Sequence, residues 1–272
     1  MDAMTTALPI TRAPLASGSV ETWTLNDPAS RNALTEALVD ALFAACERAM
    51  ADPDLRGVVL RGADGHFCAG GSLGGFAKTI GQPLGAGESD PLVPMNRRFG
   101  ALLQALCALP QWLVVVVEGA AMGGGIGLVC CADHVLAHTK AQFGTPEVTL
   151  GIVPAQIAPF VVRRMGVAQA RRWLLTGERF DAAAAQRAGL VDEVVDGDMD
   201  VAVLAAIQRH AAAAPQAVAA TKRLLLSQPD MPLPTLLDDA ALAFAHALRG
   251  TEAPQGLAAF AARKAPPWSA NL

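Results

Sequence analysis

The chain has 272 residues, which is enough for one large domain or for a core with an appendage. Its net charge is −4 and its basic residues form only small clusters, so nucleic-acid binding is excluded as a main role. The longest apolar run, Trp112 to Val117, is far too short to span a membrane, and no membrane partner is expected.

Composition narrows the chemistry further. Charged residues make up only 17% of the chain, which is low for a monomer with a large wet surface and predicts an oligomer. Tyrosine is absent, so phenolic acid/base catalysis is excluded. The cysteines include no C-x-x-C pair and are odd in number, a pattern that suits a reducing cytoplasm; they stand at positions 46, 68, 107, 130 and 131.

The first part of the chain predicts a tail and then an α/β core. Residues 1–17 lack a basic start and an apolar centre, so they do not form a signal peptide and are expected to be a flexible tail. From 18 to 197 the chain alternates strand-like and helical segments, which indicates an α/β architecture. The expected strands lie near 20–25, 57–61, 112–117, 134–137 and 191–195.

Helices are expected in two regions. A Gly/Pro-rich stretch from 81 to 94 leads into a helix over 94–109. From residue 198 on, the chain is rich in alanine and predicted to be helical over 199–213, 215–227, 234–248 and 253–264.

Two of the expected strands run into glycine-rich turns. The strand near 57–61 is followed by a turn that contains Gly70-Gly71, and the strand over 112–117 is followed by a turn that contains Gly123-Gly124-Gly125. The second turn opens a short apolar segment that is expected to be a buried helix. A strand, a glycine turn and a helix N-terminus present backbone N–H groups to an anion. Two such turns could supply one N–H group each to a single oxygen.

The glycine spacing narrows the kind of anion. The second turn has no Gly-Lys-Ser/Thr ending, so it is not a phosphate-binding P-loop. It also lacks the Gly-x-Gly-x-x-Gly spacing of dinucleotide-binding folds, because its glycines stand at 119, 123, 124, 125 and 127. An oxyanion formed during acyl chemistry fits these residues. Close helix packing through small residues is the alternative.

A third element, from Phe143 to Pro154, places one carboxylate among apolar residues and prolines. Desolvation of Glu147 would raise its pKa and suit acid/base catalysis, whereas the alternative is that it caps the helix after Pro146. His134 and His138 would suit a metal ion on a helix, but the residues between them predict a strand, so no metal site is expected.

Taken in chain order, these segments resemble the crotonase superfamily, the enoyl-CoA hydratases and isomerases. The resemblance covers the chain from about Val20 to its C-terminus. Its markers are Asn26-Asp27-Pro28, Arg31-Asn32-Ala33-Leu34, Phe67-Cys68-Ala69-Gly70-Gly71, Gly123-Gly124-Gly125, Cys131-Ala132-Asp133, Phe143-Gly144-Thr145-Pro146-Glu147, Leu175–Asp181, Ala188–Val191 and Ala220-Thr221-Lys222.

The resemblance implies a fold and an assembly. The fold would be α/β, a crotonase-like spiral of β-β-α repeats over residues 18–197, with a C-terminal α-helical trimerisation region over residues 198–272. The assembly would be a homotrimer or a dimer of trimers. The substrate would be an acyl-CoA thioester, and coenzyme A would be part of the substrate, with no separate cofactor.

The resemblance also implies a mechanism. The thioester carbonyl oxygen would lie between the backbone N–H groups of Gly71 and Gly124, which would stabilise the enolate formed when a proton moves at the neighbouring carbon. Hydratases of the family carry two glutamates; Glu147 matches the second, but Gly127 stands where the first would be. Glu118 could be a second catalytic group, or could hydrogen-bond to loop backbone behind the turn.

The remaining positions implied by the resemblance contact the substrate and its CoA part. Ser72 replaces the Asp that usually follows the first turn, and Ser can cap a helix as Asp does. Lys222 is a further candidate. The matched binding residues are Arg31, Ala33, Ala69, Ser72, Leu73, Gly123, Gly127, Pro146, Phe260 and Lys264.

A finer resemblance concerns the substrate. The segment from Gly151 to Arg164, together with Asp90-Pro91 and Asn96 to Gly100, is similar to the branch of methylglutaconyl-CoA and isohexenylglutaconyl-CoA hydratases. This similarity predicts hydration of a branched or glutaconyl-type enoyl-CoA. Arg97 or Arg98 could then meet a second carboxylate, unless both are solvated surface arginines.

Three alternatives remain open from the sequence. The first is an enoyl-CoA delta isomerase that uses Glu147 as its single proton shuttle. The second is a thioester-hydrolysing homologue that uses the same turns. The third is a non-catalytic homologue, since one expected glutamate is missing.

Overall fold

The computed structural model describes residues 6–72, 79–85, 87–228 and 231–269. Its main sheet has the strand order β1-β2-β3-β4-β6-β9, and all neighbours are parallel except β1 and β2, which are antiparallel. The strands are β1 (Ile10–Pro14), β2 (Ser19–Leu25), β3 (Leu55–Gly62), β4 (Trp112–Val117), β6 (His134–His138) and β9 (Glu193–Val195). A second sheet of short strands comprises β5 (Ala120–Met122), β7 (Gln142–Gly144) and β8 (Arg179–Asp181).

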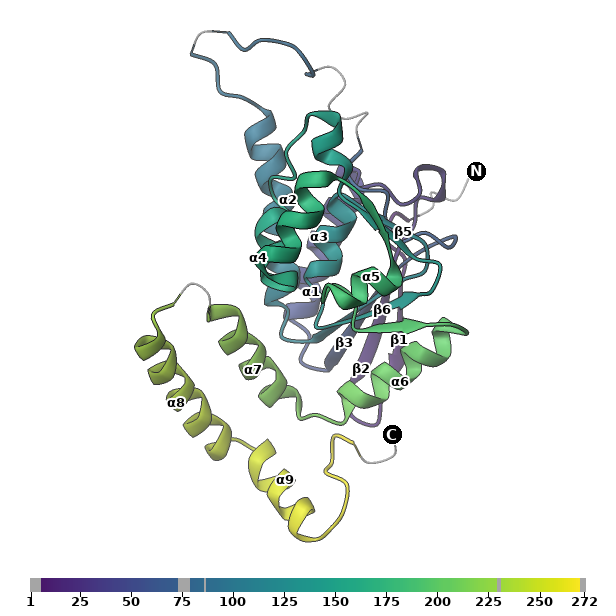
Figure 1. Cartoon of the computed structure of the whole chain (residues 1–272). Helices are drawn as coiled ribbons and strands as arrows, with labels where there is room; N and C mark the ends of the chain where they lie inside the picture. Colours follow the sequence, from purple (N-terminus) through teal and green to yellow (C-terminus); the bar gives the residue numbers. More distant parts are fainter. Residues whose placement is uncertain (1–5, 73–78, 86, 229–230, 270–272) are drawn as a thin grey trace.

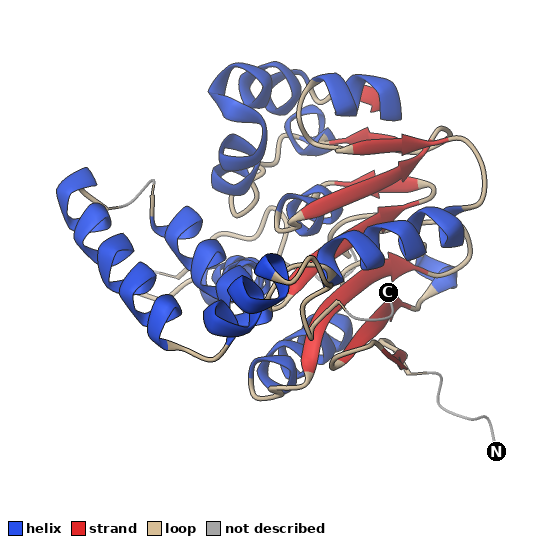
Figure 2. Cartoon of the chain, turned by 90° about the horizontal axis from the view of Figure 1, so that it is seen from below, coloured by secondary structure: helices blue, strands red, loops and turns tan. Residues whose placement is uncertain are grey.

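Helices cover both faces of the main sheet, and Figure 2 shows the layers from below. Strand β4 is apolar throughout because alternate side chains enter different cores. Leu113, Val115 and Val117 pack toward the larger core, which is built with α1 (Glu36–Met50), α2 (Leu92–Ala108), α3 (Gly124–Cys130), α4 (Ala158–Thr176) and α5 (Ala182–Arg187). Trp112, Val114 and Val116 pack toward α6 (Met199–Ala211). The glycine turns lie at the C-terminal ends of β3 and β4.

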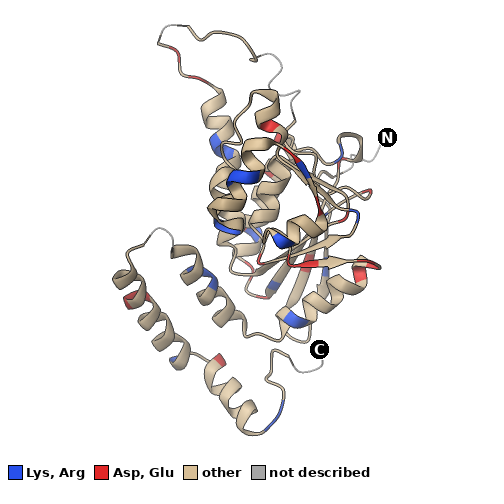
Figure 3. Cartoon of the chain, in the orientation of Figure 1, with Lys and Arg blue, Asp and Glu red and all other residues tan. Residues whose placement is uncertain are grey.

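The remaining helices, α7 (Pro215–Ser227), α8 (Leu233–Arg249) and α9 (Glu252–Ala261), form an arm that extends away from the sheet (Figure 1). None of the described residues in these three helices is buried. Many are nevertheless large and apolar, and Figure 3 shows few charged residues on the arm. The helical segments expected in the C-terminal part are confirmed to within two or three residues at their ends.

The arm is anchored to the core at its first helix. Lys222 Nζ on α7 lies 2.6 Å from Asp133 Oδ2 and 2.6 Å from the carbonyl oxygen of Gln111. Both bonds hold α7 against the core, so the structure gives Lys222 an anchoring role. The contact with CoA considered for it stays a prediction. No described helix is long and apolar enough to cross a bilayer.

The expected flexible tail over residues 1–17 is wrong for residues 10–14, which form β1. Each residue of β1 is paired with β2, from Ile10 opposite Trp23 to Pro14 opposite Ser19. No apolar pattern indicates this strand, because every β1 side chain is exposed at the sheet edge. Backbone pairing with β2 holds the strand, together with a polar network that Arg12 of β1 joins.

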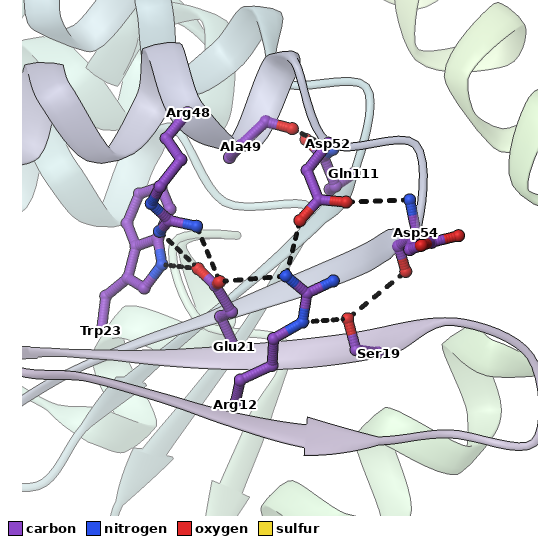
Figure 4. A network of polar contacts seen from close by, with 9 residues as sticks. All are labelled: Arg12, Ser19, Glu21, Trp23, Arg48, Ala49, Asp52, Asp54 and Gln111. Carbon is purple, nitrogen blue, oxygen red and sulfur yellow. Dashed lines mark hydrogen bonds and ion pairs between the residues drawn. The ribbon is translucent and has the colours of Figure 1, made fainter.

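Glu21 is the centre of that network (Figure 4). Its side chain is almost fully buried, and it accepts hydrogen bonds from Trp23 Nε1 at 2.8 Å and from both terminal nitrogens of Arg48 at 2.7 and 2.8 Å. Arg12 of β1 lies 3.9 Å from Glu21 and donates to Asp52 at 2.6 Å. Burial alone would raise the pKa of Glu21, but the hydrogen bonds from Arg48 and Trp23 outweigh it and lower the pKa.

Replacing Glu21 by Gln is expected to lower the free energy of unfolding by about 1.5–3 kcal/mol near neutral pH, because hydrogen bonds to a charged group are lost. The folded-state pKa of Glu21 lies below its unfolded value, so its contribution is complete above the unfolded pKa and disappears as the pH falls through the folded pKa. Urea unfolding at neutral and acid pH measures both effects. Asp52→Asn, at the more exposed pair with Arg12, is the control, and an equal loss there would contradict the role of Glu21.

Candidate active site

Backbone hydrogen bonds join the two glycine turns into one structure. The N–H group of Cys68 donates to the carbonyl of Ala120 at 2.9 Å, and the N–H group of Met122 donates to the carbonyl of Cys68 at 2.9 Å. A third segment joins from the other side, since the N–H group of Leu34 donates to the carbonyl of Gly70 at 2.8 Å. The turns after β3 and β4 are therefore brought together, as the sequence predicted.

Glycine is required where the two turns approach most closely. A side chain at Gly70, which has a φ of 92°, would begin 2.8 Å from the carbonyl oxygen of Met122. A side chain at Gly125 would begin 2.8 Å from the carbonyl oxygen of Cys68. Both spacings are shorter than van der Waals contact, so larger residues would force the turns apart.

The approach leaves two backbone N–H groups without a partner. Gly124 is the first residue of α3, where the helix supplies no acceptor for its N–H group. Within the described residues, neither this N–H group nor that of Gly71 donates a hydrogen bond. Gly71 is exposed, and a Cβ atom there would meet nothing within 4 Å. These groups can donate hydrogen bonds to a substrate oxygen, with the positive end of α3 adding to their field.

Glu147 lies against the second glycine turn. It belongs to a 3-10 helix over Pro146–Leu150, and a Cβ atom at Gly123 would lie 2.7 Å from its Oε1 atom. The absence of a side chain at Gly123, which has a φ of 50°, thus makes room for the carboxylate beside Gly124. The Oε2 atom is buried without a hydrogen-bond partner.

Burial determines the protonation behaviour of Glu147. Desolvation raises its pKa, and a hydrogen bond with its own backbone N–H group opposes this only in part. The side chain caps no helix, because the residue before the 3-10 helix is Thr145 and no capping bond is made there. Of the two roles left open by the sequence, the geometry fits a desolvated acid/base group.

Apolar side chains occupy the space beside Gly127, the position at which the resemblance implied a first glutamate. A Cβ atom at Gly127 would lie 2.7 Å from Cγ2 of Ile157 and 3.2 Å from Cδ1 of Leu103. Both side chains are buried. The space that a glutamate at position 127 would need is therefore filled by apolar side chains. A longer residue at this position would have to move α2 or the start of α4.

Glu118 does not supply a replacement for the missing carboxylate. Its Oε2 atom lies 3.1 Å from Arg61, and Arg61 also binds Asp200 of α6 at 2.7 Å. This chain of ion pairs runs along the face of the sheet that α6 covers. Neither sequence interpretation of Glu118 fits, because its carboxylate pairs with the side chain of Arg61 on β3 rather than with loop backbone or groups on the substrate side.

Cys68 lies within the first turn but is unsuited to nucleophilic catalysis. Its side chain is fully buried, and its sulfur accepts a hydrogen bond from the N–H group of Gly70 at 3.4 Å. Burial raises the pKa of the thiol to about 12. Since the thiolate is the reactive form, Cys68 serves the packing of the turn.

The predicted binding residues fall into two groups. Arg31, Ala33, Ala69 and Ser72 lie where the segment after β2 pairs with the first turn: the N–H group of Ala69 donates to Arg31, and that of Ser72 donates to Leu34. Pro146 adjoins Glu147. Leu73 lies outside the described residues. Phe260 and Lys264 are exposed. Helix α9, which contains Phe260 and directly precedes Lys264 in the chain, lies far from α3 in Figure 1, so one chain alone does not bring this segment to the turns.

Sequence reasoning missed the side chains that close the wall of the site. Leu34 and Phe99 lie within 2.6 and 3.3 Å of where a Cβ atom of Gly124 would be, and Ile157 with Leu103 faces Gly127. Phe99 and Leu103 are four residues apart on α2, a helical spacing that could have indicated one shared face. For Ile157 no sequence signal was available.

Replacing Gly127 by Ala is expected to cost about 1–2 kcal/mol of stability, which is the overpacking penalty less the helix preference of alanine. Most of this cost should disappear in an Ile157→Ala background, where the new methyl group has room. Urea unfolding of the four proteins in this cycle gives the coupling energy. Gly71→Ala is the control, because its methyl group meets nothing. A cost that is the same with and without Ile157 would contradict the packing described.

Comparison with known proteins places the chain in a family. The family model described as enoyl-CoA hydratase/isomerase matches residues 16–271. The chain is 32% identical to the 2,3-dehydroadipyl-CoA hydratase of Escherichia coli over 245 residues, which cover 89% of this chain and 92% of that protein. It is also 37% identical over 189 residues to the peroxisomal bifunctional enzyme of Danio rerio, and it spans only 24% of the length of that longer protein.

Solved structures agree with this result. An enoyl-CoA hydratase/isomerase from Marinobacter aquaeolei superimposes with a TM-score of 0.89 at 39% identity, covering 97% of this chain and 99% of the other. AtuE from Pseudomonas aeruginosa superimposes with a TM-score of 0.88 at 44% identity, covering 96% and 99%. The expected crotonase-like α/β fold is thereby confirmed. The chain is an enzyme that belongs to the enoyl-CoA hydratase/isomerase family.

Proposed function

We propose that the chain is a hydratase that adds water across the double bond of an enoyl-CoA thioester through a stabilised enolate. The N–H groups of Gly71 and Gly124 would bind the thioester carbonyl oxygen, and Glu147 would move the proton. Preorganised donors lower the barrier because they need no reorganisation as charge develops, and one such donor is typically worth about 3–4 kcal/mol.

The observation that carries this proposal is the position of the Glu147 carboxylate. It lies against Gly123, one residue before the unpaired N–H group of Gly124. A substrate oxygen bound at that N–H group would place the adjacent carbon of the acyl chain within the neighbourhood of the carboxylate. Proton transfer and oxyanion stabilisation would then act on one reacting unit, as enolate chemistry requires.

One carboxylate is sufficient for the proposed hydration. Glu147 takes a proton from water while the water oxygen bonds to the β-carbon, and the electron pair of the double bond moves toward the carbonyl oxygen. The enolate then collapses, and Glu147 returns its proton to the α-carbon. The water is added in full and Glu147 ends as it began. CoA enters only as part of the substrate, and no cofactor is needed.

The proposed acyl group is branched or glutaconyl-type, in line with the resemblance to the methylglutaconyl-CoA and isohexenylglutaconyl-CoA hydratases. The relative from Escherichia coli supports a polar acyl chain, since its name, 2,3-dehydroadipyl-CoA hydratase, denotes a dicarboxylic substrate. The apolar packing of Ile157 and Leu103 beside Gly127 supports a wall against which a branched chain can lie.

A specific observation favours one alternative, an enoyl-CoA delta isomerase. With the space beside Gly127 filled, Glu147 is the carboxylate on the turn, and one carboxylate that removes and returns a proton is all that isomerisation needs. Thioester hydrolysis on the same turns and a non-catalytic role are further possibilities. Product analysis separates them, because only hydrolysis releases free CoA.

We also propose that the chain assembles as a homotrimer or a dimer of trimers. The apolar residues on the arm support this, because an unpartnered apolar surface is stabilised by burial against another subunit. Phe260, which is 83% exposed, and Lys264 would then reach the CoA bound by a neighbouring subunit. Arg31, Ala33 and Ala69 would contact CoA within the same subunit.

Glu147→Gln is expected to lower turnover of 3-methylglutaconyl-CoA by about 100-fold or more, the scale of lost general acid/base catalysis. Mass spectrometry and the absorbance of the conjugated thioester follow the reaction. Hydration predicts a product heavier than the substrate by one water molecule; unchanged mass with a shifted double bond would instead indicate an isomerase. Glu118→Gln is the matched control and should keep its activity, and full activity of Glu147→Gln would contradict the role of Glu147.

The activity should fall at acid pH with an apparent pKa above the ordinary glutamate value of about 4.3. The sign follows from the role: Glu147 must be ionised to accept the proton of water, and its burial raises the pH at which it ionises. The pH profile of kcat/KM for wild type, compared with that of Glu118→Gln, measures this acid limb, the fall of activity at low pH. A limb at or below the ordinary glutamate value would show that the working base is not desolvated.

A further inference from the structure

One face of α2 covers the glycine turn and continues into a polar cluster. Phe99 and Leu103 pack over Gly124 and Gly127, as described above. One residue beyond Phe99, Gly100 has no side chain, and a Cβ atom there would lie only 1.9 Å from Oε1 of Gln156. Glycine at this position therefore lets the amide of Gln156 sit directly on the helix, next to the apolar wall.

Two neighbours on α2 complete the cluster. The Gln156 amide nitrogen donates to Oδ1 of Asn96 at 2.9 Å. The Cβ position of Gly100 is also 3.4 Å from a terminal nitrogen of Arg97, so the guanidinium lies over the same glycine. Gln156 directly precedes Ile157, which packs on Gly127. We call Asn96, Arg97 and Gln156 the polar cluster; it adjoins the wall of the proposed acyl site.

The structure distinguishes the two consecutive arginines that the sequence could not separate. Arg98 is neutralised by an ion pair with Asp40 and lies over the ring of Phe43, with its guanidinium carbon 5.2 Å from the ring centre. Arg97 points along α2 and donates to the neutral Oε1 of Gln104 at 2.8 Å. Among the described residues, Arg97 makes no ion pair, so its positive charge has no protein counter-charge.

The surroundings of the polar cluster are apolar and open. Val93 and Met95 of α2 are exposed, and so are Ile152 and Val153 in the segment that leads from Glu147 to Gln156. Figure 1 shows the start of α2 and the start of α4 at the same end of the molecule. An acyl chain that leaves the glycine turn on this side would pass apolar side chains first and then meet a cation with free N–H donors.

We propose that Arg97 binds a carboxylate at the far end of the acyl chain, and that the protein thereby selects dicarboxylic enoyl-CoA thioesters over their uncharged counterparts. This inference rests on the proposed function. Of the five N–H donors of Arg97, one is committed to Gln104, and Asn96 retains its amide N–H groups for a second contact. Charge-assisted hydrogen bonds of this kind are about twice as strong as neutral ones, and the carboxylate supplies the missing counter-charge.

The test compares Arg97→Gln with Arg98→Gln on two substrates of equal carbon skeleton, 3-methylglutaconyl-CoA and 3-methylpent-2-enoyl-CoA. Arg97→Gln should lower kcat/KM for the carboxylated substrate by about 10- to 100-fold, mainly through KM, and leave the uncharged substrate unchanged. Arg98→Gln should leave both unchanged. Equal losses on both substrates, or no loss on the carboxylated one, would overturn the inference.

A binding experiment separates this inference from the proposed reaction. Glutaryl-CoA and pentanoyl-CoA have the same number of acyl carbons and cannot be hydrated. Calorimetry should show tighter binding of glutaryl-CoA to wild type, and this preference should disappear in Arg97→Gln but not in Arg98→Gln. If wild type prefers glutaryl-CoA and Arg97→Gln loses this preference, but wild type turns over no enoyl-CoA, the subsite is retained and the hydratase proposal is refuted. If wild type hydrates enoyl-CoA but does not prefer glutaryl-CoA, the hydratase proposal is retained and the subsite is refuted.

Discussion

The close backbone approach of two glycine turns is the constraint on which the site depends. Each turn follows one of two neighbouring parallel strands, β3 and β4, so the sheet register brings both turns to the same edge. The carbonyl groups of Cys68 and Met122 come so near Gly125 and Gly70 that any side chain would separate the turns. This approach leaves the N–H groups of Gly71 and Gly124 without a hydrogen-bond partner among the described residues. These two free donors are the feature that suits acyl chemistry.

The same packing that forms the turns also sets the behaviour of Glu147. Its carboxylate fits against Gly123 because no side chain stands there, and burial in this position raises its pKa. A low local dielectric strengthens hydrogen bonds from the free N–H groups and penalises the charged carboxylate at the same time. With Ile157 and Leu103 beside Gly127, no second carboxylate adds like-charge repulsion. We infer that a single tuned glutamate serves both proton transfers.

Much of this arrangement was predictable because it depends on local patterns: apolar runs such as that of β4, glycines at strand ends, and one acid among prolines. The exposed edge strand β1 was missed because Ile10 to Pro14 shows no buried face. Consecutive residues on a helix point in different directions. Which of Arg97 and Arg98 faces the site therefore depends on how α2 packs against the core, and the sequence of α2 alone does not show this. The packing of Ile157 on Gly127 depends on where α4 begins relative to α3, which no spacing within either segment reveals.

The central claim is that the two turns polarise a thioester carbonyl. Infrared difference spectroscopy of carbonyl-labelled [1-13C]crotonyl-CoA bound to Glu147→Gln tests it most directly, since this variant should bind the thioester without consuming it. The account predicts that the labelled carbonyl stretch moves to lower frequency in the complex than in water, because two preorganised N–H groups donate hydrogen bonds to its oxygen. A frequency unchanged from that in water would contradict the account, whatever the activity of the wild type.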